Sequence, residues 1–231
     1  MMSSLLYPAL VSSIIESTIT HPIDVIKIHK QTSQPILYKF KTLYSGYIPR
    51  ALGNIPSRTI FLFSQDYLHT YFNSKKNYEV SKKSQCIIIP LLAGFSQTLI
   101  DTPVEVLKMN QVMNVKNTFL YKGFLPHFFR NFIFVLCVYN FKQFGISNSN
   151  RSQDNSWGSN YLNTALYGAI GGVIGSYVSH PLDTLKTCIQ SNRSYKHFTI
   201  KDYYKGCHLR AGMGMINMFV SLYVFEIMKK F

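Results

Sequence analysis

Three segments of this chain carry the same pattern: a proline, an acid two residues later and a base five residues later. The prolines are Pro22, Pro103 and Pro181, so the copies lie 81 and 78 residues apart. With nine prolines and ten acidic residues in 231 residues, chance gives far fewer than one match. The pattern therefore indicates an internal triplication in which each copy forms one structural unit. We place the repeats at residues 1–80, 81–158 and 159–231 of a single domain.

The composition favours a membrane protein. Hydrophobic residues make up 47% of the chain and charged residues only 15%, whereas soluble domains have about a quarter charged residues. Too few charges remain to cover an ordinary water-facing surface. The mean hydropathy is nevertheless close to zero, at +0.04. This combination predicts helices with one lipid-facing side and one polar side.

Six stretches of the sequence are long enough to cross a bilayer as helices. They cover residues 5–28, 50–72, 86–109, 124–144, 161–189 and 210–228. Each repeat contributes two of them, with the motif proline near the end of the first. We therefore predict an all-α membrane protein with six transmembrane helices in three pseudo-threefold repeats around a central cavity. The Ser- and Asn-rich segment 147–160 is predicted to be a loop.

The acid and the base of each motif lie three residues apart and so share one helix face. Charges inside a membrane are costly unless they are paired or hydrated. If the three motif helices surround a common axis, each acid can pair with the base of a neighbouring helix. The charges concerned are Asp24 and Lys27, Glu105 and Lys108, and Asp183 and Lys186.

A second motif, an aromatic residue followed two residues later by glycine, precedes each even-numbered span. Its glycines are Gly46, Gly123 and Gly206. An aromatic anchor beside a helix N-terminus can hold a lipid phosphate on exposed backbone amides. An ordinary turn with an interfacial aromatic residue fits the pattern equally well.

In these two triplicated motifs and in the six-span plan, the chain resembles the mitochondrial carrier family over nearly its whole length. The resemblance implies a monomeric multi-pass transporter of the mitochondrial inner membrane that opens its cavity alternately to either side. It also implies that the lipid at the three glycine motifs is cardiolipin. The chain is a short member, and its Lys, Asn and Ile bias indicates an AT-rich coding genome, such as that of a reduced parasite or a large DNA virus. If the chain is virus-encoded, the mitochondrion would be the host's.

The resemblance also assigns two gates. The matrix-side gate pairs six charges across helices: Asp24 with Lys108, Glu105 with Lys186, and Asp183 with Lys27. Glutamines four residues after the motif base, Gln31 and Gln190, would brace it. The opposite gate would use Asp66, His69, Glu226 and Lys229. Because this second gate lacks a charged pair in the middle repeat, we predict that the matrix-side gate is the stronger one.

Positions at which the repeats differ are candidates for recognising an asymmetric solute. The resemblance places substrate contacts seven and eight residues after each motif glycine, at Gly53, Asn54, Arg130, Asn131, Met213 and Gly214. Six residues before the motif prolines of the first two repeats lie Glu16 and Gln97. Glu16 could bind an amino or hydroxyl group, carry a proton, or be paired internally with an arginine.

The arginines predict an anionic substrate. Arg130 is a permanently charged fork in an apolar helix, and with Arg58 and Arg210 it suits phosphate or carboxylate. Gly53 and Gly214 would leave room for a flat ring. We therefore expect antiport of nucleoside or deoxynucleoside di- or triphosphates. A keto acid or phosphate carrier is the main alternative, and a proton-coupled carrier using Glu16 is another.

The net charge of +14 also admits a soluble DNA-binding protein. Lys and Arg form no stripe or long cluster, however, so we predict no nucleic-acid partner. The DNA-binding alternative predicts extraction without detergent and salt-sensitive binding to DNA. No nucleophile or acid–base pair recurs with catalytic spacing, so we predict no enzyme activity. The four cysteines lack metal-ligand spacing, and neither a metal nor a cofactor is predicted.

Overall fold

The computed structural model describes residues 2–35, 39–74, 82–149, 157–195 and 197–228, and all regular structure in these ranges is α-helical. The long helices are α1 (Met2–Gln31), α3 (Tyr47–Ser74), α4 (Lys82–Met113), α5 (Phe124–Ser149), α6 (Trp157–Gln190) and α8 (Cys207–Met228). Two short helices, α2 (Phe40–Leu43) and α7 (Ile200–Tyr203), lie between the long helices of the first and third repeats. The all-α prediction is confirmed, and each predicted helical range lies within one long helix.

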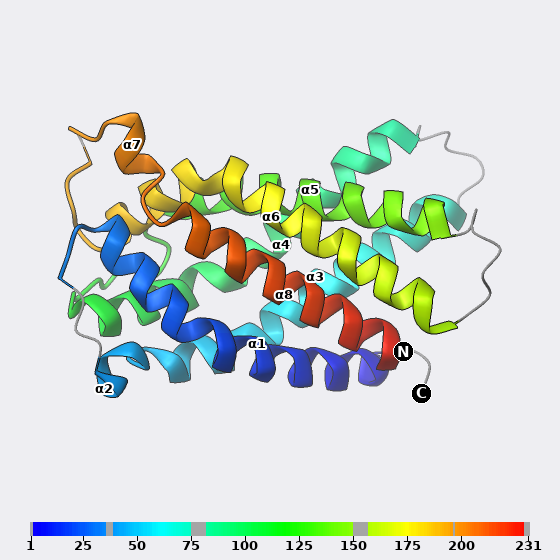
Figure 1. Cartoon of the computed structure of the whole chain (residues 1–231), viewed down its shortest axis with the longest axis horizontal. Coiled ribbons are helices and arrows are strands. Elements are labelled where there is room, and N and C mark those ends of the chain that lie inside the picture. Colours follow the sequence, from blue (N-terminus) through cyan, green and yellow to red (C-terminus); the bar gives the residue numbers. More distant parts are fainter. Residues whose placement is uncertain (1, 36–38, 75–81, 150–156, 196, 229–231) are drawn as a thin grey trace.

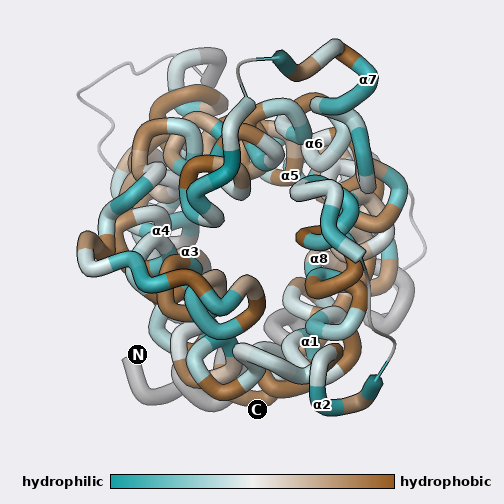
Figure 2. The backbone as a smooth tube through the Cα atoms, turned by 90° about the vertical axis from the view of Figure 1, so that its left-hand side faces the viewer, coloured by the Kyte–Doolittle hydropathy of each residue, from teal (hydrophilic) through white to brown (hydrophobic). Residues whose placement is uncertain are grey.

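The six long helices form a closed ring. Each long helix packs against the next one along the chain, and α8 returns to pack against α1. The helices run roughly along the long axis of the molecule (Figure 1), and a view along that axis shows them arranged around a centre (Figure 2). The first turn of α1 and the last turn of α8 lie at the same end, while α2 and α7 lie at the other (Figure 1).

The predicted loop at 147–160 is too long. Helix α5 continues to Ser149 and α6 already begins at Trp157, so both flanks of this segment are helical; residues 150–156 lie outside the described ranges. Ser and Asn disfavour helix interiors because they compete with the backbone for hydrogen bonds. They are tolerated in terminal turns, where backbone groups lack intrahelical partners.

The distribution of polar residues is inverted relative to that of a soluble protein. In α1, the apolar Ile14 and Ile19 are 45% and 47% exposed, whereas Ser13 and Glu16 are 0% and 1% exposed. Soluble proteins bury Ile and expose Glu. An apolar exterior around a polar interior is the arrangement expected in lipid.

By length and composition, two helices of the described part qualify as membrane spans: Ser84–Met113 in α4 and Phe124–Ser147 in α5. Inward-facing polar residues lower the hydropathy of helices such as α1, in which Glu16, Asp24 and Lys27 are all buried. Six spans therefore stay a prediction.

Helix α6 packs closely on both sides through its glycines. A side chain at Gly172 would meet the carbonyl oxygen of Gly214 in α8 at 2.7 Å. A side chain at Gly171 would meet Cα of Val138 in α5 at 2.9 Å. Since small residues let membrane helices approach closely, these glycines hold α6 between α5 and α8.

The three repeats share the same backbone turns. Gly46, Gly123 and Gly206 have φ values of 76°, 76° and 82°, which only glycine adopts readily, and α3, α5 and α8 each begin at the following residue. The space beside each glycine is occupied by the motif lysine of the next repeat or its backbone, namely Lys108, Lys186 and Lys27 respectively. Each glycine turn therefore packs against the helix of the next repeat at the level of its motif lysine.

Candidate functional site

The motif charges form a ring at the end of the bundle near α2 and α7. Lys108 Nζ lies 2.8 Å from Asp24 Oδ2, Lys186 Nζ lies 3.0 Å from Glu105 Oε2, and Lys27 Nζ lies 2.8 Å from Asp183 Oδ2. All three predicted ion pairs are thus present, each joining two repeats. We call these six residues the charge ring.

Further contacts join the pairs into a network. Lys27 also lies 3.3 Å from Asp24, and Lys108 lies 2.7 Å from Glu105, within the same motif in each case. The side chains are buried, apart from Glu105, which is 23% exposed. Buried charges of this kind hold one another in place, because removing one partner leaves the other unpaired. That the network opens and closes as a gate stays a prediction.

The two predicted bracing glutamines behave differently. Gln31 donates hydrogen bonds from Nε2 to Asp183 at 3.0 Å and to Thr184 at 3.2 Å, as expected for a brace. Gln190 instead donates to the backbone carbonyl of Lys122 at 3.1 Å. The chain just before α5 lies over the end of α6 and supplies this acceptor. Gln190 therefore ties a loop to a helix end and does not contact the charge ring.

The predicted gate at the opposite end falls mostly on side chains that are not described. The side chains of Asp66 and Glu226 and the whole of Lys229 lie outside the described part, and His69 lies near the end of α3. Its role stays a prediction.

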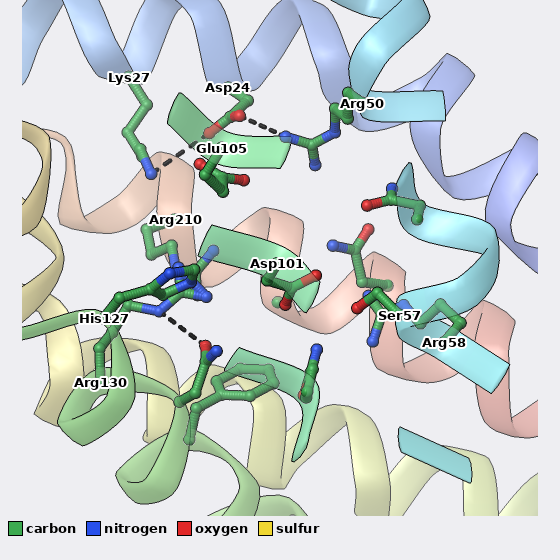
Figure 3. Close-up of a pocket in the computed structure, with 16 residues that line it drawn as sticks. Asp24, Lys27, Arg50, Ser57, Arg58, Asp101, Glu105, His127, Arg130 and Arg210 are labelled. Carbon is green, nitrogen blue, oxygen red and sulfur yellow. Dashed lines mark hydrogen bonds and ion pairs between the residues drawn. The ribbon is translucent and has the colours of Figure 1, made fainter. Parts of the chain in front are cut away.

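Next to the charge ring lies a polar cavity (Figure 3). Most of the cavity wall comes from three equivalent positions on α3, α5 and α8, the second long helix of each repeat. Four residues after the motif glycine lie Arg50, His127 and Arg210; eight residues after it lie Asn54, Asn131 and Gly214; and eleven residues after it lie Ser57, Phe134 and Asn217. Arg58, Gln97, Asp101 and Arg130 complete the wall beside the ring residues Asp24, Lys27 and Glu105.

This spacing defines the cavity face, of which only part was predicted from the sequence. Residues four, eight and eleven positions after the glycine lie within about 60° of one another on a helix with 100° per residue. Residues at position seven lie at the edge of this arc, and only the long side chain of Arg130 reaches the cavity from there. An i, i+4, i+7 search of the aligned repeats would have found His127, Ser57 and Asn217.

Two predicted substrate contacts lie outside the cavity wall, and a third lines it but has a different role from the one predicted. Gly53 does not line the cavity, because Val104 of α4 packs against it, with Val104 Cβ only 2.9 Å from where a side chain would begin. Met213 is 1% exposed and is also absent from the wall. Gly214 lines the cavity, but Gly172 O would meet a side chain there at 2.8 Å. Gly53 and Gly214 therefore serve close helix packing and do not open space for a flat ring.

Glu16 lies outside the cavity wall and is already occupied. Arg58 Nη2 lies 2.8 Å from Glu16 Oε2, and Ser221 donates a hydrogen bond to the other carboxylate oxygen. The internally paired alternative is therefore the one realised here. As a substrate contact, the Glu16 prediction is wrong for this conformation, because both oxygens have buried partners.

The predicted amides are partly committed to the scaffold. Asn54 on α3 donates a hydrogen bond to Ser17 on α1 at 2.8 Å, and Asn131 on α5 donates one to Thr98 on α4 at 2.9 Å. Each bond links the two long helices of one repeat. Gln97 lines the cavity, as predicted.

The four arginines of the wall differ in how they are paired. Arg50 bonds to Asp24, Arg58 pairs with Glu16, and Arg130 lies 3.2 Å from Asp183. Arg210 has no ion pair or hydrogen bond within the described part of the chain and lies over the Phe134 ring, 5.6 Å from its centre. A guanidinium without an acidic partner in a buried polar cavity is a binding group for an anion.

The charges of the site do not cancel. Seven cationic side chains in the ring and cavity meet five carboxylates, with histidine counted as neutral. The cations are Lys27, Lys108, Lys186, Arg50, Arg58, Arg130 and Arg210, and the acids are Glu16, Asp24, Asp101, Glu105 and Asp183. The site therefore carries a surplus of two positive charges.

The chain is similar to several carriers. A probable mitochondrial 2-oxodicarboxylate carrier of Schizosaccharomyces pombe is 25% identical and matches over 78% of this chain and 72% of its own length. A mitochondrial carrier-like protein of Acanthamoeba polyphaga mimivirus is 28% identical over 52% of this chain and 48% of its own. A probable mitochondrial adenine nucleotide transporter of Arabidopsis thaliana is 25% identical over 41% and 31%, respectively. No protein-family model matches the chain.

These relatives agree with the triplicated motif and the ring of helices built from it. Together with the motif and the ring of helices, they support membership of the mitochondrial carrier family. The relatives are named as mitochondrial carriers, and they support a transport function for this chain.

Proposed function

We propose that this protein is an antiporter of small dianions across the mitochondrial inner membrane, with 2-oxodicarboxylates as its first substrate class. The observation that carries the proposal is Arg210, which lines the cavity without a salt bridge or hydrogen bond to any acid of the described residues. An arginine fork can bind a carboxylate through two parallel hydrogen bonds. The 2-oxodicarboxylate carrier among the relatives supports this class.

The charge balance favours a dianion over a larger polyphosphate. Two carboxylates neutralise the surplus of two positive charges, whereas a nucleoside di- or triphosphate carries more negative charge than the site offers. The arginine cluster that favoured nucleotides also offers fewer binding groups, because Arg58 is neutralised by its salt bridge with Glu16. Both points favour dicarboxylates over nucleotides as the substrate class.

Nucleotides remain the second candidate because of Phe134. Its ring lies in the cavity wall next to Arg210 and offers an apolar face to a base. The relative named as an adenine nucleotide transporter supports this candidate. Faster exchange of ADP than of a 2-oxodicarboxylate would assign the protein to this class.

Two arginines would couple the cavity to the charge ring. Arg50 and Arg130 both line the cavity, and each also contacts a ring acid, Asp24 and Asp183 respectively. An anion that binds Arg130 competes with Asp183 for the same guanidinium. Binding would thus weaken one contact of the closed ring and favour the alternate conformation, as a ligand does when its contacts differ between two states.

The proposal includes the rest of the carrier plan. Six spans, a monomer and alternation between ion-paired gates are supported by the closed ring of six long helices and by the inverted polarity of α1. Cardiolipin at Gly46, Gly123 and Gly206 is supported by the three identical turns before helix N-termini, where backbone amides can hold a phosphate.

Exchange in liposomes tests the function. Purified protein is reconstituted into vesicles preloaded with unlabelled dicarboxylate, phosphate, ADP or ATP, and uptake of labelled 2-oxoglutarate and labelled ADP is measured at equal pH on both sides. We expect 2-oxoglutarate exchange and a loss of about tenfold or more in Arg210→Ala, since a charged hydrogen bond contributes about 1.5–3 kcal/mol. Lys205→Ala is the control, because it removes an exposed lysine outside the cavity. No exchange of any anion would contradict the proposal.

A further inference from the structure

Asp101 is an acid that the repeat pattern does not explain. It lies on α4 two residues before Pro103, where the other repeats have Thr20 and Ser179. Those two hydroxyls donate to carbonyls of their own helices, at 2.7 Å and 2.6 Å. A carboxylate cannot make this bond when ionised. The Asp101 side chain instead faces the cavity (Figure 3).

Asp101 is also the acid of the site that lacks a cation. Within the described residues, Asp24, Glu105, Asp183 and Glu16 each lie within salt-bridge distance of a lysine or arginine, whereas Asp101 has no ion pair. Its partner is the hydroxyl of Ser57 on α3, which donates a hydrogen bond to the carboxylate. Asp101 is therefore able to change its charge without breaking an ion pair.

The groups facing Asp101 come from α3 and α5, the helices that pack against α4. Arg58 on α3 is held by Glu16, and Arg130 on α5 is held by Asp183. His127 on α5 also lines the cavity, and Glu105 lies one turn further along α4. Arg50 on α3 also faces Asp101 and is held by Asp24. These cations are thus engaged by other acids, and Glu105 adds a second negative charge.

We propose that Asp101 is the proton-binding residue of this carrier and that a dianion crosses the membrane together with one proton on its carboxylate. The inference rests on the proposed function. A bound dianion and an ionised Asp101 would share one small cavity, and like charges at close range favour protonation of one of them. Linkage is reciprocal, so a proton on Asp101 in turn favours binding of the anion.

The proton is accounted for at each step. An O–H bond forms on an Asp101 carboxylate oxygen as the anion enters from one side, with the proton taken from water. The bond breaks and the proton returns to water when the anion leaves on the other side.

This assignment replaces Glu16 as the candidate for proton coupling. Glu16 has partners on both oxygens and does not line the cavity. Protonating it would release Arg58 as an unpaired buried charge, which is strongly unfavourable. Asp101 has no such penalty, because Ser57 can hydrogen-bond to either protonation state.

Net uptake under a proton gradient tests the proposal. Once Asp101 has released its proton, the carrier can return without a counter-anion, so proton coupling adds net uptake to the exchange of the proposed function. Vesicles that contain a pH-sensitive dye and no substrate receive labelled 2-oxoglutarate, with the membrane potential clamped to zero by potassium and valinomycin. With the outside one pH unit more acidic, we expect an inside-to-outside ratio of up to about ten, since one pH unit is a tenfold proton ratio. The interior should acidify as the label enters.

Three variants locate the proton. Asp101→Asn should lose both the accumulation and the substrate-driven acidification, and Asp101→Glu should retain them with a shifted pH midpoint. Ser57→Ala should shift the midpoint as well. Asp202→Asn, which removes an acid of α7 outside the cavity, should behave like the wild type.

The outcomes separate the two claims. Wild-type protein that exchanges 2-oxoglutarate at uniform pH but neither accumulates it nor acidifies the interior would overturn the proton role alone. Coupling that persists in Asp101→Asn would assign the proton to another group and overturn it too. Loss of all transport in both Asp101 variants would make Asp101 structural. Absence of exchange for every anion would contradict the proposed function, and this inference with it.

Discussion

The charge ring and the cavity beside it are built by the same three repeats and yet differ in regularity. In the ring, each repeat supplies one acid and one base, and the three pairs that join repeats measure 2.8, 3.0 and 2.8 Å. In the cavity, equivalent positions carry unlike residues, such as Arg50, His127 and Arg210. On the proposed function, the ring repeats because all three units would take part in one gating motion. The cavity varies because a small solute is asymmetric.

Neutralising a ring acid should have the largest effect. In Asp183→Asn, Lys27 and Arg130 both lose a buried acidic partner. Breaking a buried pair costs about 3–5 kcal/mol, so we expect a clearly lower unfolding temperature in detergent and nearly complete loss of exchange. Asp66→Asn at the opposite end should be milder. Equal losses in the two variants would show that the ring is not the stronger gate.

The packing glycines Gly53 and Gly214 should have the next largest effect. Gly53→Ala and Gly214→Ala place a side chain against Val104 and against Gly172 of the neighbouring helix. Overpacking costs about 1–3 kcal/mol, which thermal unfolding would detect. Gly212→Ala is the matched control, because no atom lies within 4 Å of a side chain there. If Gly53→Ala altered substrate preference at unchanged stability, the glycine would belong to recognition after all.

Substitutions of the two glutamines should have the smallest effects, and they distinguish a contact of the charge ring from a contact of the loop before α5. Gln31→Ala removes hydrogen bonds to Asp183 and Thr184 and should destabilise the closed ring by about 1 kcal/mol. Gln190→Ala removes only a bond to the Lys122 carbonyl, outside the ring. Exchange rates should therefore change in the first variant and stay near wild type in the second. The reverse order would restore Gln190 as a brace.

The regular part of the molecule could be predicted from the sequence. The three motifs predict the helix pairs and a ring of six charges, because a period of about 80 residues applies one geometry three times. The partner of each ring charge came from the family resemblance. The paired lysines and acids follow from the high energetic cost of leaving a charge unpaired in a membrane.

The cavity was harder to predict because its residues do not repeat. Gly53 and Met213 were chosen at a position that points between helices, whereas Ser57 and Asn217 lie on the cavity face four residues further along. Asp101 was missed because candidate substrate contacts on the first long helix of each repeat were compared at one position only, six residues before the motif proline. Whether Glu16 pairs with Arg58 depends on side-chain placement, which spacing alone does not determine.

The most direct test of the difference between ring and cavity is substrate preference in the reconstituted protein. The ratio of 2-oxoglutarate to ADP exchange is measured for the wild type, Arg210→Ala and Asp183→Asn, with Asp183→Asn assayed at a protein amount that gives a measurable rate. We expect Arg210→Ala to change this ratio, because the proposed function places Arg210 in direct contact with the anion. Asp183→Asn should lower both rates in proportion. An unchanged ratio in Arg210→Ala, or a changed ratio in Asp183→Asn alone, would contradict the assignment of recognition to the cavity.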